Sequence, residues 1–156
     1  LRCAGAIVAA NPLLKGYVEL RRQTPPAVLK GVILPGERFA LTMSNPPFNS
    51  SAEEADAGTR RKWENLGRDP RQKRNFGGGA GELWCPGGEA AFAKTMVEES
   101  PAFAGQVGWF TVLLSKVETI DGLKGALKRV KAADVRVIDM AQGQKKSRLL
   151  AWTFAP

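Results

Sequence analysis

The stretch Asn45-Pro46-Pro47-Phe48 carries residue types whose spacing could do chemistry. It follows the apolar run FALTMS, and neither proline can donate a backbone hydrogen bond, so a strand through that run must end at Asn45. The Asn45 side-chain oxygen and the Pro46 carbonyl can each accept one hydrogen of a planar amine, such as the exocyclic nitrogen of adenine. The nitrogen lone pair is then drawn out of conjugation and can attack an electrophilic methyl group, while Phe48 offers a face for the base to stack on.

Composition excludes several other kinds of chemistry. Histidine is absent from all 156 residues, which excludes mechanisms that use an imidazole as base or metal ligand. The amine described above needs no such base, because alkylation makes it acidic enough to lose its proton to water. Cys3 and Cys85 lack the spacing of a zinc motif, so we expect two reduced thiols and no metal. No run approaches the roughly 18 apolar residues of a membrane span, so we expect a cytoplasmic protein with no membrane partner.

The charge of the chain favours a polyanionic partner. The net charge is +8 and the pI is about 9.9, an excess that suits phosphate neutralisation. Residues 60–74, RRKWENLGRDPRQKR, hold seven basic and two acidic side chains, a net of +5, and QKKSR at 144–148 adds three more basic ones. A solvated or disordered loop is the alternative for residues 60–74, because surface charge needs no partner.

The remaining sequence predicts the elements that must position these residues. Apolar periodicity predicts helices at residues 1–11, 25–33, 89–100 and 120–133. It predicts strands at residues 17–23, 39–44, 106–115, 135–142 and 147–154. This order indicates an α/β sheet whose last two strands form an antiparallel pair. Ligands of open α/β sheets bind beyond the carboxyl ends of strands, which is where Asn45 lies, although Asn-Pro-Pro is also a common way to end a strand.

A long segment, residues 49–88, follows the Asn45 corner and contains the glycine-dense stretch GGGAGELWCPGGE. It is too long for an ordinary connection, so we interpret it as functional, with disorder as the alternative. GGGAG lacks the Lys-Ser or Lys-Thr of a phosphate-binding loop, which favours a flexible lid or close backbone approach. Glu82 and Glu89 could cap a helix start or contact the substrate, and we favour capping for Glu89 because a helix is expected to start there. We expect Trp84, Trp109 and Trp152 to lie in the core and Trp63 to be available for stacking.

Four motifs resemble a known family, in order and in spacing. NPPF between a strand and a loop resembles the tetrapeptide of S-adenosylmethionine-dependent amino-methyltransferases. The motifs are NPPFNSSAEEADAGTRRKWENLG, NFGGGAGELWCPGGEAAF, VGWFTVLLSK and MAQGQKKSRLLAWTF. Together they resemble the bacterial family that methylates N6 of one adenine in large-subunit (23S) ribosomal RNA. A eukaryotic relative that acts on a spliceosomal RNA is similar but more distant.

The resemblance implies a fold and a site. The fold would be a Rossmann-like class I S-adenosylmethionine-dependent methyltransferase, with residues 1–156 as the C-terminal portion of a single domain and a basic, glycine-rich insertion at 49–88. Asn45, Pro46 and Phe48 would orient and stack the target adenine, and Thr24 and Asn45 would approach S-adenosylmethionine. Ribosomal RNA would contact a set of basic residues: Arg60, Arg61, Lys62, Arg71, Lys73, Arg74, Lys145 and Lys146.

One departure from the family pattern concerns the cofactor. Methyltransferases of this fold hold S-adenosylmethionine with a glycine-rich loop and an acidic residue, and both should precede Leu1. We therefore expect the fold to be incomplete at its N-terminus, to expose unpaired strand edges, and to bind cofactor weakly or not at all. The chain alone would then be inactive. Two alternatives stay open, a non-catalytic RNA-binding module and a methyltransferase for protein glutamine amides.

Overall fold

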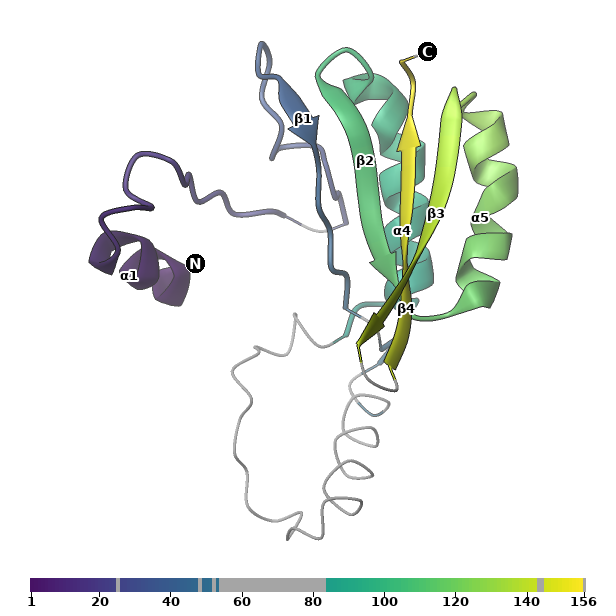
Figure 1. The fold of residues 1–156 in the computed structure, drawn as a ribbon, viewed down its shortest axis with the longest axis horizontal. Helices are drawn as coiled ribbons and strands as arrows, with labels where there is room; N and C mark the ends of the chain where they lie inside the picture. The colour runs from purple at the N-terminus through teal and green to yellow at the C-terminus, as the bar shows by residue number, and fades with distance from the viewer. Residues whose placement is uncertain (25, 48, 52, 54–83, 143–144, 156) are drawn as a thin grey trace, which may run out of the picture.

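The computed structural model describes residues 1–24, 26–47, 49–51, 53, 84–142 and 145–155. The strands are β1 Phe39–Leu41, β2 Val107–Leu114, β3 Asp134–Gln142 and β4 Lys145–Thr153. The helices are α1 Arg2–Ala10, α4 Gly88–Glu99, α5 Val117–Arg129 and the 3-10 helix η1 Ser100–Phe103. The sheet has the order β1-β2-β4-β3, with β1 parallel to β2 and the other pairs antiparallel. Helices α4 and α5 lie on one face of this sheet (Figure 1).

The core lies between the sheet and these two helices. Every second residue of β2 points toward the helices, and Phe110, Val112 and Leu114 are fully buried there. Trp152 of β4 stacks on Phe110 with 5.6 Å between ring centroids, and its indole N–H donates to the Ser100 hydroxyl at 3.0 Å. Trp152 is therefore core, as predicted.

The helices complete this core. Helix α4 contributes Ala93, Met96 and Val97, all fully buried and spaced as one helical face. Trp84 and Trp109 are only partly buried, so their placement in the core was wrong. Trp109 lies between inward-facing neighbours on β2 and so points to the other face of the sheet.

The helix expected at residues 25–33 is not present in the described part of that stretch. The carboxylate of Glu99 accepts hydrogen bonds from the backbone N–H groups of Val28, Leu29 and Lys30, at 2.7–3.3 Å. Bonds from Val32 and Ile33 to the Leu29 carbonyl make one turn rather than a helix. The short apolar run is buried by this contact with α4, so its hydrophobicity reports burial and not helical structure.

The strand expected at residues 17–23 is also wrong, because these residues form turns and irregular backbone. A strand requires a ladder of hydrogen bonds with a neighbour, and none of the described segments provides one here. Arg21 fixes the segment instead. Its guanidinium donates to Glu19 at 2.7 and 2.8 Å, to the Val32 carbonyl at 2.6 Å and to Glu37.

The contact between Arg21 and Glu37 makes part of the stability depend on pH. Hydrogen bonds from Arg21 and from the Leu34 N–H lower the pKa of Glu37 from its ordinary 4.5 to about 2. A carboxyl group with a lowered folded-state pKa stabilises the fold above its unfolded pKa, and this stabilisation is lost as the pH falls through the folded value. We therefore expect urea unfolding to show a stability difference between the native chain and Glu37→Gln that is full above pH 4.5 and shrinks toward pH 2. An unchanged difference across that window would contradict the assignment.

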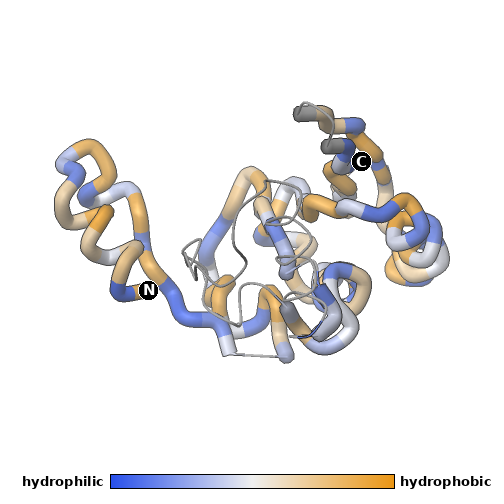
Figure 2. The backbone as a smooth tube through the Cα atoms, turned by 90° about the horizontal axis from the view of Figure 1, so that it is seen from below, coloured by the Kyte–Doolittle hydropathy of each residue, from blue (hydrophilic) through white to orange (hydrophobic). Residues whose placement is uncertain are grey.

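Strand β1 is an exposed edge of the sheet. It covers only Phe39–Leu41 of the longer strand expected at 39–44. The side chains of Phe39, Leu41 and Met43 are exposed, as expected for a strand with one unpaired edge. Helix α1 has no buried residue and lies apart from the sheet in both views (Figures 1 and 2). Across the described ranges, no helix is both long enough and apolar enough to cross a membrane.

Candidate active site

The Asn45 corner is held to β2 from its amino-terminal side. The parallel pairing of β1 with β2 continues past Leu41, because Thr42 donates to the Trp109 carbonyl at 2.9 Å and Ser44 to the Thr111 carbonyl at 3.1 Å. Leu113 donates in return to the Ser44 carbonyl at 2.8 Å. These bonds fix the backbone up to the residue before Asn45.

Close approach of the two strands supports this pairing. A Cβ atom on Gly108 would lie 2.6 Å from the Ala40 carbonyl oxygen, so only glycine lets β2 come this near to β1. The side chain of Thr111 adds a further bond, from its hydroxyl to the Thr42 carbonyl at 2.6 Å.

The carboxyl-terminal side of the corner is held by a different segment. Asn49 forms a parallel bridge with Trp84, and its carbonyl accepts a hydrogen bond from the Cys85 N–H at 3.1 Å. The chain then turns into α4 through Gly87, which has a φ of 78° and whose Cβ would lie 2.6 Å from that of Ala91. The corner is thus clamped at both ends, by a strand before it and by the entry to a helix after it.

Asn45 and Pro46 lie at this corner with opposite exposure. Pro46 is buried, whereas Asn45 is exposed and its carboxamide makes no hydrogen bond with the part of the chain that the structure describes. The two prolines fix φ and cannot form ladder bonds, so the backbone that carries Asn45 is stiff. Asn45 therefore presents an acceptor and two donors beyond the carboxyl ends of β1 and β2.

Cys85 lies beside this corner, because its N–H donates to the Asn49 carbonyl. Burial raises the pKa of its thiol, and a hydrogen bond to the Gly88 carbonyl at 3.3 Å lowers it only in part. Both cysteines are free, as expected, and Cys85 stays a thiol at neutral pH. It is therefore a structural residue of the turn and not a candidate nucleophile.

A buried carboxylate organises the edge of the sheet beside the corner. Glu89, in the first turn of α4, is 2% exposed. Its oxygens accept hydrogen bonds from the Ser115 N–H at 2.9 Å and hydroxyl at 2.7 Å, the Lys116 N–H at 3.0 Å and the Thr119 hydroxyl at 3.1 Å. Glu89 thus lies in the first turn of α4, where a negative charge is favourable, but its hydrogen bonds go to the entry of α5 and not to its own helix.

Of the other predicted site residues, the structure describes the side chains of only a few. Thr24 is exposed in the irregular segment before β1, and Lys146 is exposed in β4. Because Arg148 pairs with Leu114, the start of β4 lies at the same edge of the sheet as the carboxyl end of β2. Lys145 begins β4, but its side chain lies outside the described residues, as do the following predicted residues: Phe48, Trp63, Arg60, Arg61, Lys62, Arg71, Lys73 and Arg74.

Sequence reasoning missed two residues of this edge. Arg148 of β4 is largely buried and forms an ion pair with Asp139 of β3 at 3.1 Å. Ser115 directly follows β2 and is fixed by Glu89. The available signal was weak, since a basic residue in an alternating strand and a serine after an apolar run also occur on ordinary surfaces.

Solved structures share this arrangement of strands and helices. The catalytic domain of hMettl16 in complex with the MAT2A 3'UTR hairpin 6 has a TM-score of 0.74 and 24% identity, over 98% of this chain and 51% of that one. The N-terminal domain of human METTL16 in complex with SAH has a TM-score of 0.67 and 19% identity, over 98% of this chain and 47% of that one. The chain therefore has the α/β fold of class I methyltransferases, as predicted, here in part and ending in antiparallel strands.

Sequence comparison narrows this class to a family. A family model described as RNA methyltransferase matches residues 1–156, and the chain belongs to that family. The ribosomal RNA large subunit methyltransferase F of Ectopseudomonas mendocina (strain ymp) is 55% identical over 159 residues, 99% of this chain and 48% of that protein. Its counterpart in Pseudomonas aeruginosa (strain PAO1) is 52% identical, and the matched region spans 99% of this chain and 47% of that protein. The predicted family is confirmed, and the chain spans about half the length of the curated relatives it matches.

Proposed function

We propose that the protein to which this chain belongs transfers a methyl group from S-adenosylmethionine to N6 of an adenine in 23S ribosomal RNA, in the cytoplasm. The observation that carries the proposal is the exposed carboxamide of Asn45 on a corner clamped at both ends. The names of the relatives, ribosomal RNA large subunit methyltransferase F, support the choice of RNA. We further propose that residues 1–156 are the C-terminal portion of one catalytic domain.

Asn45 and Pro46 would position the amine. Two acceptors on adjacent residues, the Asn45 side-chain oxygen and the Pro46 carbonyl, can take both amine hydrogens and leave the lone pair directed away from the ring. Phe48 would support the base by stacking, which contributes about 1 to 3 kcal/mol and offsets part of the cost of unstacking it from the RNA. Catalysis by these residues is positioning, because no proton has to be taken from a neutral amine before it reacts.

The described residues suit part of a cofactor site. S-adenosylmethionine supplies the methyl group when it is bound. Asn45 fits a contact with that molecule, because its exposed carboxamide offers both donors and an acceptor, and the exposed Thr24 offers a hydroxyl. We propose that these two residues hold it from one side, and that basic residues, Lys146 among them, hold the RNA phosphates.

A chimera tests this function. It joins the chain to the parts of the Ectopseudomonas mendocina relative that the chain does not cover, and it is incubated with radiolabelled S-adenosylmethionine and 23S ribosomal RNA. We expect label in RNA, recovered as N6-methyladenine after digestion, and steep loss of RNA binding as salt is raised. Under the same conditions, the 156-residue chain alone should bind cofactor weakly in calorimetry and transfer no label.

Other outcomes would overturn the proposal. RNA binding without transfer by the chimera would identify a non-catalytic RNA-binding module. Label in protein, recovered as methylated glutamine, would identify a methyltransferase for amides.

A further inference from the structure

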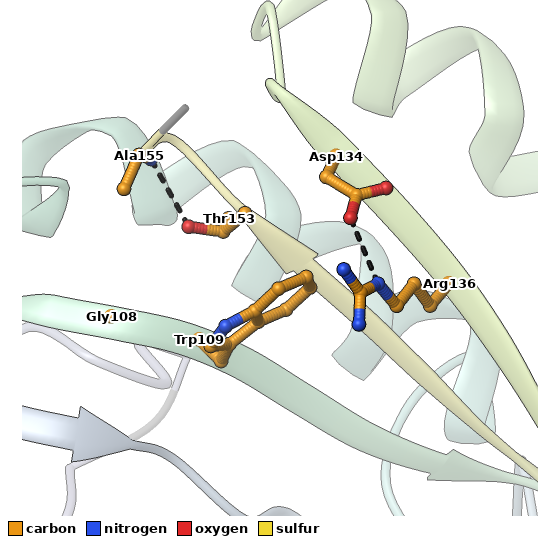
Figure 3. A pocket seen from close by; sticks show the side chains of 6 residues that line it. All are labelled: Gly108, Trp109, Asp134, Arg136, Thr153 and Ala155. Atoms are coloured by element: carbon orange, nitrogen blue, oxygen red, sulfur yellow. Dashed lines mark hydrogen bonds and ion pairs between the residues drawn. The ribbon is translucent and has the colours of Figure 1, made fainter.

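Two clusters of bonded side chains lie outside the Asn45 corner, and they differ in what they hold. The first lines a cavity of about 200 Å³ on the face of the sheet opposite α4 and α5, where Arg136 lies over the Trp109 ring and donates to Asp134 at 2.8 Å (Figure 3). Helices cover both faces of the sheet in doubly wound α/β domains. Because the chain spans about half the length of its relatives, we assign no ligand to this cluster. The second cluster joins the segment before Thr24 to α4.

Side chains hold the segment before Thr24 in place of a ladder between strands. Arg21 donates to the Val32 carbonyl at 2.6 Å, and Nε2 of Gln23 donates to the Lys30 carbonyl at 2.9 Å. The two donors are two residues apart, and the two acceptors are two residues apart in the opposite direction. The segment therefore lies antiparallel to the residues that accept its bonds, and two side chains fix the backbone that leads into Thr24.

The acceptors belong to the Leu29 turn, residues 28–33, which is itself fixed to the core. Leu29 and Ile33 are buried among the core residues. Glu99, at the carboxyl end of α4, is also buried, and its carboxylate accepts from three consecutive N–H groups of the turn, at 2.7–3.3 Å. The Leu29 turn is therefore a fixed base on which the preceding segment can be held.

Gln23 connects this base directly to Thr24. Its Nε2 donates to the Lys30 carbonyl, and its Oε1 accepts from the Thr24 N–H at 2.8 Å. Lys30 in turn donates its own N–H to Glu99 at 3.1 Å. Thr24 is exposed, and its hydroxyl makes no hydrogen bond with the described residues. A continuous series of bonds thus runs from α4 through Lys30 and Gln23 to an exposed threonine whose hydroxyl is free for a ligand.

We propose that Gln23 is a positioning residue of the cofactor site, which holds Thr24 in the conformation that binds S-adenosylmethionine, and that Glu99 anchors it through the Leu29 turn. The inference rests on the proposed function, which gives Thr24 this contact. Loss of Gln23 lowers the fraction of molecules in the binding conformation, and the apparent dissociation constant rises by the reciprocal of that fraction. The methyl transfer step at Asn45 does not involve Gln23, so its rate stays unchanged once cofactor is saturating.

Gln23→Met in the chimera tests this role, because methionine has a similar length and lacks both polar atoms. We expect calorimetry to show binding of S-adenosylmethionine about tenfold weaker, as the loss of two hydrogen bonds allows. The single-turnover rate at saturating cofactor and the affinity for RNA should not change. In the 156-residue chain alone, the Thr24 amide should exchange faster with solvent, a readout that needs neither cofactor nor RNA.

Gln106→Met provides a matched control. Nε2 of Gln106 donates to the Leu34 carbonyl at 2.7 Å and to the Glu37 carbonyl at 3.0 Å. This glutamine therefore also makes two bonds to the backbone that precedes β1, but it has no contact with Thr24. Thermal melts should show a similar loss of stability in both variants, and only Gln23→Met should lose affinity for the cofactor.

Glu99→Gln tests the anchor independently, because it weakens the bonds to the Leu29 turn and leaves Gln23 in place. It should also weaken cofactor binding, and its effect should not add fully to that of Gln23→Met, since both residues act through Lys30. Unchanged cofactor affinity in Gln23→Met, or an equal loss in Gln106→Met, would overturn the proposal. A native chimera that binds no cofactor would overturn the proposed function and this inference with it, which separates the two failures.

Discussion

Asn45→Ala in the chimera is expected to lower the single-turnover rate of methyl transfer about a hundredfold, as the loss of one key polar contact in a preorganised site does. Asn45 is exposed on a corner whose backbone is fixed on both sides, so the substitution removes the carboxamide without disturbing the fold. Binding of RNA should change little, since most RNA affinity comes from phosphate contacts elsewhere. The loss should therefore appear in the rate of the chemical step.

Asn45→Asp is the informative comparison for this prediction. A carboxylate keeps the acceptor that the amine requires but lacks the two N–H donors of the carboxamide. If Asn45 acts by accepting from the amine, Asp should retain more activity than Ala. Equal loss in the two variants would favour a donor role toward the cofactor, and an unchanged rate in Asn45→Ala would remove the residue from the site.

Helices and strands that are determined by the sequence of their own segment could be predicted. The apolar alternation of β2 and the helical spacing in α4 and α5 each report one buried face, and the structure contains all three. The antiparallel pair β3 and β4 was predicted from two strands separated by a short connection. Pairing with β2 stops at Ser44, as the two prolines after Asn45 predicted, although β1 itself covers only Phe39–Leu41.

Elements with a distant cause could not be predicted. Residues 17–23 have strand-like composition, but Arg21 bonds to Glu37 and Val32 in place of a neighbouring strand. The turn around Leu29 depends on Glu99, a residue seventy positions later in the chain. Propensity reports what a segment prefers and not which partner it finds. The hydrogen bonds of Glu89 could not be predicted for the same reason, because its partners follow it by 26 to 30 positions.

The candidate site also combines features that local sequence predicts with features that depend on distant contacts. The role proposed for Asn45 was predicted from its residue type and from a rigid corner, and it stays a prediction for which the exposed carboxamide is accessible. The clamp formed by Asn49 and Cys85 could not be inferred, because it joins segments on either side of the long insertion. The position of the corner therefore depends on contacts that residue spacing does not report, and Glu89 holds the same region from the helix side.

Glu89→Ala is expected to lower the free energy of unfolding by about 3 kcal/mol. The carboxylate is 2% exposed and accepts four hydrogen bonds, two of them from the backbone at the start of α5. Its removal leaves these donors without their partner and takes a negative charge from the amino-terminal end of that helix, where a negative charge is favourable. Urea unfolding followed by circular dichroism measures the loss as a lower midpoint.

Glu98→Ala in the same helix provides the control. Glu98 is exposed, and its nearest cationic partner, Lys94, lies 3.9 Å away, so the substitution should change stability by no more than about 0.5 kcal/mol. Both substitutions change helix propensity and net charge in the same way, so the difference between their stabilities measures the contribution of the buried hydrogen bonds of Glu89. In the chimera, Glu89→Ala should also slow methyl transfer below the unfolding temperature, because Ser115 and the entry to α4 lose a fixed position beside the Asn45 corner. Equal stability of the two variants would mean that water replaces the carboxylate at no cost, and that the edge of the sheet is fixed by β1 and β2 alone.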